Sequence, residues 1–187
     1  MIETSLENLD TDYIDLMLIH SPRPWQEFFT PVGNNYFAEN IDVWHAMEET
    51  YKNGKLRSIG VSNFDIMDID NIISNCEIAP MVNQIRVHIG HTPKDIIDYC
   101  QNRNILVEAY SPNATGKLTG NKIISEMAQK YNVSVPQLGI RYCLQLNLLP
   151  LPKSVNIEHI KQNAQLDFVI TSEDMKKLSE IEEINSL

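Results

Sequence analysis

The chain has 187 residues, with 25 acidic against 15 basic side chains and a formal net charge of −10. Hydrophobic residues make up 43% and charged residues 21%, a globular composition that excludes a disordered chain, a collagen-like repeat and a coiled coil. The acidic balance disfavours nucleic acid and anionic membrane surfaces as partners, because both carry negative charge. The length predicts a single domain over residues 1–187.

The sequence contains no targeting or membrane signal that we recognise. No run approaches the roughly 18 to 20 consecutive apolar residues that cross a bilayer. The opening residues Met1 to Thr4 lack the basic start and apolar core of a secretory signal. We therefore expect a cytoplasmic protein.

The three cysteines, Cys76, Cys100 and Cys143, are far apart and form no C-x-x-C pair. This spacing predicts neither a disulfide framework nor a zinc site, and we expect no metal centre. We expect the three thiols to be small buried hydrophobic groups.

Five short runs rich in β-branched and aliphatic residues alternate with stretches of helical period. They cover residues 14–19, 58–61, 81–85, 105–110 and 148–151. Because the runs are mostly apolar on both faces, they are typical of parallel strands covered by helices.

Helix-start signals lie between and after these runs. The segments 92–95, 134–137 and 171–174 each place a Ser or Thr three positions before an Asp or Gln, the pattern of a helix cap. A further amphipathic face covers residues 123–131. Helices therefore separate the strands, which leaves two architectures, a doubly wound sheet or a (β/α) barrel.

The residues that end the strands favour the barrel. Polar or aromatic side chains of different kinds follow each run, and barrel enzymes build their sites at this end of the strands. These residues are His20, Ser62, Asn63, Gln84, Tyr110, Ser111, Lys153 and Ser154. A doubly wound dinucleotide domain would instead carry G-x-G-x-x-G after its first strand, and the sequence has no such motif.

Five ordered motifs resemble those of the aldo-keto reductase family, whose members are (β/α)8 barrels that reduce aldehydes and ketones with NADPH. The motifs are similar to the family's fourth to eighth strands, and the resemblance covers roughly residues 4–184. In chain order they lie at residues 12–22, 54–64, 82–85, 109–112 and 151–163.

The resemblance implies a partial (β/α)8 TIM barrel of about five parallel βα units, a truncated form in which the three N-terminal strands are absent. Those strands supply the family's catalytic Asp, Tyr and Lys. Without that Tyr as general acid, we expect this chain alone to be inactive in carbonyl reduction. Five strands would also leave two apolar edges unpaired, which predicts self-association through them.

His20 ends the fourth-strand motif, and the resemblance makes it a catalytic hydrogen-bond donor to the oxygen of a small-molecule carbonyl substrate. Outside this motif, a histidine that ends an apolar strand is more often a core residue. A loop that would overhang the barrel mouth follows His20, and its aromatic residues either line an apolar substrate pocket or pack the loop onto the barrel. These residues are Trp25, Phe28, Phe29, Tyr36 and Phe37.

The resemblance assigns cofactor binding to ten positions. Side-chain amides at Asn63 and Gln84, with the hydroxyl of Ser62, suit the carboxamide of nicotinamide, although Ser-Asn after a strand is also a common helix cap. Tyr110 would stack on the nicotinamide ring, or else be a core residue. The ten are Ser62, Asn63, Gln84, Tyr110, Ser111, Lys153, Ser154, His159, Gln162 and Asn163.

The phosphate end departs from the family pattern at one position. Lys153, Ser154 and a helix beginning near Asn156 suit an anion, but His159 stands where the family commonly has Arg for the 2′-phosphate. A neutral imidazole lacks the charge and bidentate geometry of guanidinium. We therefore expect NADPH as cofactor with NADH also accepted.

Two functions remain open. The chain is either the C-terminal part of an NAD(P)H-dependent aldo-keto reductase or a non-catalytic homologue that keeps the nucleotide groove for binding or partner sensing. Arg86 stands where an acidic residue is usual, and the sequence offers no account of it.

Overall fold

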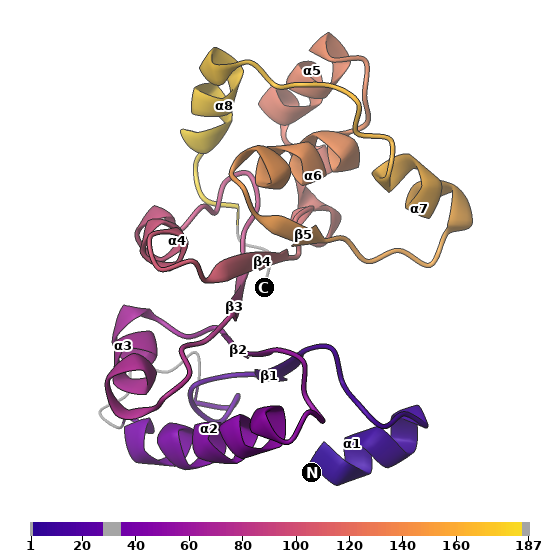
Figure 1. Cartoon of the computed structure of the whole chain (residues 1–187). Helices are drawn as coiled ribbons and strands as arrows, with labels where there is room; N and C mark the ends of the chain where they lie inside the picture. Colours follow the sequence, from indigo (N-terminus) through magenta and orange to yellow (C-terminus); the bar gives the residue numbers. More distant parts are fainter. Residues whose placement is uncertain (1, 28–34, 185–187) are drawn as a thin grey trace. The chain divides into compact units, whose positions relative to one another are not determined.

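The computed structural model describes residues 2–27 and 35–184 and has an α/β fold with five parallel strands (Figure 1). The chain divides into two compact units, residues 1–84 with 98–106 and residues 85–97 with 107–187. No helix in the described residues is long and apolar enough to cross a membrane.

The first unit pairs its strands in parallel and in chain order. Ile19 lies opposite Val61, and Ser62 lies opposite Gln84. The longest helix, α2, contacts both β2 and α3. The elements are α1 (Ile2–Leu9), β1 (Met17–Ile19), α2 (Phe37–Lys52), β2 (Ile59–Ser62), α3 (Ile66–Asn75) and β3 (Val82–Arg86), which continues into the second unit.

The core of the first unit lies between α2 and the strands. Every residue of β2 is buried, as expected for a strand covered on both faces. Trp44 of α2 is fully buried, and its indole Nε1 donates to the carbonyl of Ile78 at 2.8 Å. This bond fixes the segment that leads into β3 against the helix.

The second unit pairs β4 with β5 in parallel, with Tyr110 opposite Leu151. Its helices begin where the sequence predicted, because Ser134 caps α6 and Thr171 caps α8 through their hydroxyls. The elements are α4 (Lys94–Gln101), which continues into the first unit, β4 (Leu106–Tyr110), the 3₁₀ segment η1 (Ala114–Gly120), α5 (Lys122–Lys130), α6 (Val135–Gln145), β5 (Leu149–Leu151), α7 (Ile157–Asn163) and α8 (Ser172–Ser179).

Three expectations need correction. The first strand begins at Met17, because Ile14 forms only an isolated bridge with Leu56. The predicted aromatic loop ends early, since Phe37 opens α2, while Phe28 and Phe29 lie outside the described residues. The thiols are free, and they are buried at Cys100 and Cys143 but only half-buried at Cys76.

Gly60 generates a test of the strand packing. A Cβ at this position would lie 2.6 Å from the carbonyl oxygen of Val82 and 2.8 Å from Cδ2 of Leu18. We expect Gly60→Ala to lower the free energy of unfolding by about 1–3 kcal/mol, because β2 and β3 must separate. Chemical denaturation of the variant measures this loss.

Gly120→Ala is the matched control, because a Cβ there meets nothing within 4 Å. Both variants remove the same backbone freedom from the unfolded chain, so their difference reports packing. Equal stability of the two variants would contradict the close approach of β2 and β3.

Candidate functional site

Three predicted site residues come together where β1 and β2 end beside the middle of β3. The Asn63 amide nitrogen Nδ2 donates to the carbonyl of His20 at 3.1 Å. The backbone N–H of Asn63 donates to the carbonyl of Gln84 at 2.9 Å. His20, Asn63 and Gln84 are therefore joined into one network within the first unit.

Ser62 completes this network from a buried position. Its hydroxyl donates to the Gln84 carbonyl at 2.9 Å and lies 3.0 Å from Nδ2 of Asn63, from which it accepts. Asn63 has a backbone φ of 62°, in the left-handed region that asparagine tolerates better than most residues. The helix-cap alternative for this pair is wrong, because Asp65 caps α3.

His20 is exposed at the end of β1, so the core-histidine alternative is also wrong. Its imidazole stacks on the indole of Trp25, with ring centroids 5.3 Å apart and planes inclined by 12°. This contact restricts the ring while leaving it open to solvent, where it can act as a hydrogen-bond donor.

Tyr110 and Ser111 end β4 in the second unit, where both are half-buried. Burial raises the pKa of the Tyr110 hydroxyl, and the positive charge of Arg86 offsets part of that rise. Ser111 has a φ of 52°, a left-handed turn that directs the chain away from the strand. Nη1 of Arg86 is buried with no hydrogen-bond partner among the described residues.

The second unit contains a cavity of about 470 Å³ that gathers half of the predicted cofactor positions. Five predicted residues line it: Lys153, Ser154, His159, Gln162 and Asn163. Five others complete the wall: Asn113, Thr115, Gly116, Ser134 and Pro136.

The helix α7 begins beside this cavity with two of its backbone N–H groups bonded to its own cap. Asn156 caps α7 by accepting from the backbone N–H groups of Glu158 at 2.9 Å and His159 at 3.4 Å. Those two amides are thus bonded within the helix cap, and the anion site at the helix start stays a prediction. Lys153 is exposed, and its ammonium forms no ion pair within the described residues.

Sequence reasoning missed the wall formed by Asn113, Thr115 and Gly116. This loop adopts left-handed backbone at Thr115 and Gly116, with φ of 52° and 92°. It lies directly on α6, because a Cβ at Gly139 would be 2.7 Å from Oδ1 of Asn113. The glycine at 116 after a predicted strand was the available signal.

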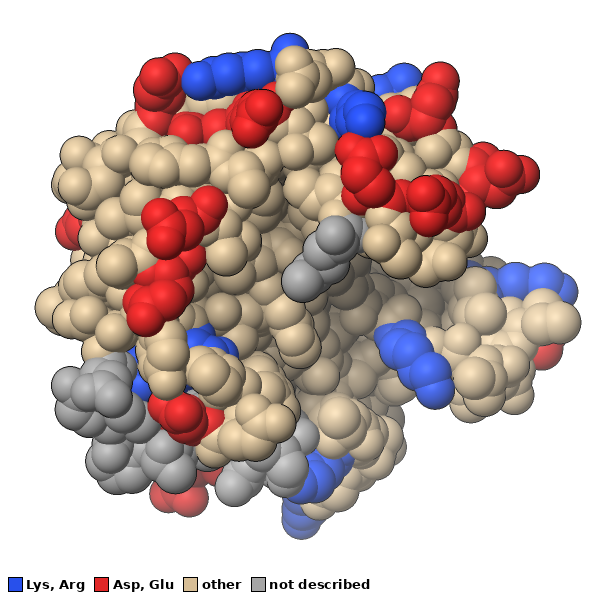
Figure 2. All heavy atoms as spheres, turned by 90° about the horizontal axis from the view of Figure 1, so that it is seen from below, with Lys and Arg blue, Asp and Glu red and all other residues tan. Residues whose placement is uncertain are grey.

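A second hollow of the molecule carries mainly acidic side chains. An open hollow of about 610 Å³ in the first unit includes none of the predicted site residues. Its charged lining residues are Glu3, Glu7, Asp10, Asp12 and Lys55, and Lys55 pairs with Glu3. On the face shown in Figure 2, red acidic groups and blue basic groups are interspersed, without one continuous basic area among the described residues.

Comparison with known proteins identifies the family. The family model described as the aldo/keto reductase family matches residues 1–183. The chain belongs to this family. A glyoxal reductase of Bacillus subtilis is 40% identical over 177 residues, which are 94% of this chain and 59% of the relative.

Solved structures of the family share this fold. An aldo-keto reductase from a deep-sea metagenome library superposes with a TM-score of 0.86 at 34% identity, over 96% of this chain and 64% of that one. A Bombyx mori aldo-keto reductase crystallised with NADP gives a TM-score of 0.82 at 35% identity, over 96% and 61%. The chain thus spans about six tenths of the length of these relatives.

The network at Ser62 is open to a direct test. We expect Ser62→Ala to lower the free energy of unfolding by about 0.5–1.5 kcal/mol, because the buried Ser62 hydroxyl loses its bonds to the Gln84 carbonyl and the half-buried Asn63 amide. The exposed Ser179→Ala, at the end of α8, should change it by less than about 0.5 kcal/mol. Urea titrations of both variants make the comparison, and a neutral Ser62→Ala would argue against the network.

Proposed function

We propose that this chain binds NADPH, accepts NADH as well, and serves in the reduction of aldehydes and ketones to alcohols. The observation that carries the proposal is the cavity of about 470 Å³ in which Lys153, Ser154, His159, Gln162 and Asn163 come together. These five were assigned to the phosphate and adenosine end by motif alone. The NADP complex of the Bombyx mori relative supports the same cofactor class.

The cavity's chemistry fits a phosphate-bearing adenosine. The Lys153 ammonium provides the permanent charge, and Ser154, Gln162 and Asn163 provide neutral donors. A volume of about 470 Å³ lies within the usual range of small-molecule sites. His159 lines the same space with an imidazole, which lacks the bidentate geometry of a guanidinium.

Each unit also carries predicted cofactor positions at or near its strands. In the first unit, the Asn63 side-chain amide donates to the His20 carbonyl and the Ser62 hydroxyl, and that hydroxyl donates to the Gln84 backbone carbonyl, so the Asn63 amide is oriented before any ligand arrives. In the second unit, the Tyr110 ring and the Ser111 hydroxyl stand at the end of β4. Preorganisation of this kind lowers the entropy lost on binding.

Reduction needs a hydride and a proton, and the bound dinucleotide supplies the hydride. His20 would orient the substrate by donating from its ring to the carbonyl oxygen, where negative charge develops. The ring is already restricted by Trp25, which reduces the reorganisation required. The proton would come from the family's Tyr. The five strands would then form part of an eight-stranded barrel that contains this Tyr.

Lys153 gives the first test of the cavity. We expect Lys153→Met to weaken NADPH binding by about 10- to 100-fold, because a charge-assisted contact to phosphate is lost. Lys122→Met is the control, since Lys122 is exposed on α5, lies outside the cavity lining and pairs with Glu126. Isothermal titration of the 187-residue chain measures the NADPH affinity of both variants. Equal affinities would rule out Lys153 as a phosphate ligand.

His159 gives a test of cofactor choice. The chain should prefer NADPH over NADH by less than about a hundredfold, because imidazole replaces a guanidinium contact worth roughly 1.5–3 kcal/mol. His159→Arg should raise that preference about tenfold or more. Equilibrium titrations with both dinucleotides measure the ratio, and a preference of a hundredfold or greater in the unaltered chain overturns the interpretation.

Turnover distinguishes the two functions. General acid catalysis contributes about 10²–10⁴-fold, so the chain assayed by itself should show no NADPH oxidation with a reactive aldehyde. Dinucleotide binding without turnover in a form that also carries the family's Asp, Tyr and Lys would favour the non-catalytic homologue. Turnover by the chain alone that His20→Ala abolishes would show that His20 acts as the acid.

A further inference from the structure

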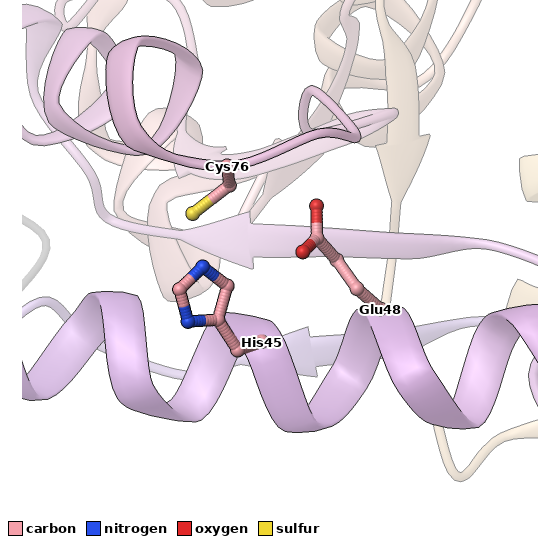
Figure 3. Close-up of side chains that lie close together, drawn as sticks. All are labelled: His45, Glu48 and Cys76. Atoms are coloured by element: carbon pink, nitrogen blue, oxygen red, sulfur yellow. The ribbon is translucent and has the colours of Figure 1, made fainter.

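A second cluster of ligand-type side chains lies in the first unit, apart from every residue assigned above. His45 and Glu48 stand three positions apart on one face of α2, and Cys76 is the residue that ends α3. The imidazole, carboxylate and thiol atoms all lie within 4.8 Å of one another. Figure 3 shows the Cys76 sulfur and the Glu48 carboxylate directed toward the space beside the His45 ring.

We propose that His45, Glu48 and Cys76 bind one Zn²⁺ ion. Nitrogen, carboxylate oxygen and thiolate are the three ligand types that zinc takes in proteins, and three protein ligands leave a fourth position for water. Mg²⁺ and Ca²⁺ are disfavoured, because both prefer a shell made of oxygen alone.

The backbone around the cluster holds one of its ligands in place. The Ile78 N–H donates to Oε1 of Glu48 at 2.6 Å, and the carbonyl of the same residue accepts from the Trp44 indole. Glu48 is buried, so this bond fixes the carboxylate orientation in the way that outer-shell hydrogen bonds fix metal ligands. Its second oxygen remains to coordinate the ion.

The separations suit zinc after a small adjustment. Bonds of about 2.0–2.3 Å in a tetrahedral shell place ligand atoms roughly 3.3–3.8 Å apart. The present limit of 4.8 Å therefore requires movement on the order of 1 Å. His45 is exposed on the helix surface, so rotation of its side chain supplies this movement without repacking the core.

Charge balance at the cluster is simple. Burial, together with the negative charge of Glu48, raises the pKa of the Cys76 thiol to about 11, so the metal-free thiol is protonated at neutral pH. Formation of the sulfur–zinc bond releases this proton to solvent. The resulting thiolate and the Glu48 carboxylate neutralise the dication. The ion would join the end of α3 to α2.

Metal titration of the reduced 187-residue chain tests the proposal. Isothermal titration with Zn²⁺ should give one ion per chain. Co²⁺ in its place should produce a near-ultraviolet charge-transfer band from thiolate to cobalt, together with the intense visible bands of a tetrahedral site. No saturable binding, or cobalt binding without the charge-transfer band, would overturn the proposal independently of any variant.

Three variants identify the ligands. His45→Gln, Glu48→Gln and Cys76→Ser should each weaken Zn²⁺ binding roughly tenfold or more, since outer-shell changes alone cost about 10–100-fold. Glu48→Gln can still accept from the Ile78 N–H, and Glu49→Gln is its exposed control on the same helix. Circular dichroism checks the fold. Unchanged affinity in His45→Gln and Cys76→Ser would exclude the site.

Discussion

The parallel register that sets Ser62 opposite Gln84 is the constraint on which the first unit's site depends. Side chains alternate along a strand, so a slip of one residue would turn the Ser62 hydroxyl to the other face of the sheet. Asn63 would then lose the Ser62 hydroxyl as an acceptor for its amide, and its side chain would be less firmly oriented toward the His20 carbonyl. The positions of Ser62, Asn63 and Gln84 therefore follow from strand pairing rather than from loop conformation.

Electrostatics shape the second unit's cavity in a protein whose net charge is −10. An anion approaching such a chain meets overall repulsion, so attraction must be local. Lys153 provides that attraction on the cavity wall, while Asn156 already occupies the two nearest helix amides. The Lys153 side chain, more than the helix terminus, thus supplies positive charge at this cavity.

Sequence patterns located most strands because the central ones are apolar on both faces, and they located α6 and α8 because a hydroxyl caps each. They missed the start of α2 for a physical reason. Tyr36 precedes that helix without making a side-chain capping bond, so no local signal marks the boundary. The aromatic residues before this boundary predicted a loop that includes Phe37, whereas Phe37 is the first residue of α2.

The residues of the candidate site likewise fall into those that sequence patterns identified and those that they missed. A motif identified the cavity residues between Lys153 and Asn163 because they are close together in the sequence. The opposite wall at Asn113 and Gly116 is remote in sequence from them, and only folding brings it there. Folding likewise brings Cys76 close to His45 and Glu48. Spacing rules for metal sites compare residues that are neighbours along the chain, whereas here a strand separates the two helices that carry these residues.

The contact between Gly139 and Asn113 bears on how the cavity moves. A wall that lies on a helix backbone with no side chain between them has no room to swing inward. The loop at 111–116 should then open only when α6 itself loosens, and its bonded amides should exchange hydrogen with solvent on the slow timescale of that helix. Ligand entry through this side of the cavity would leave the loop in place, so the rate of capture would be set by diffusion and charge rather than by a gating motion.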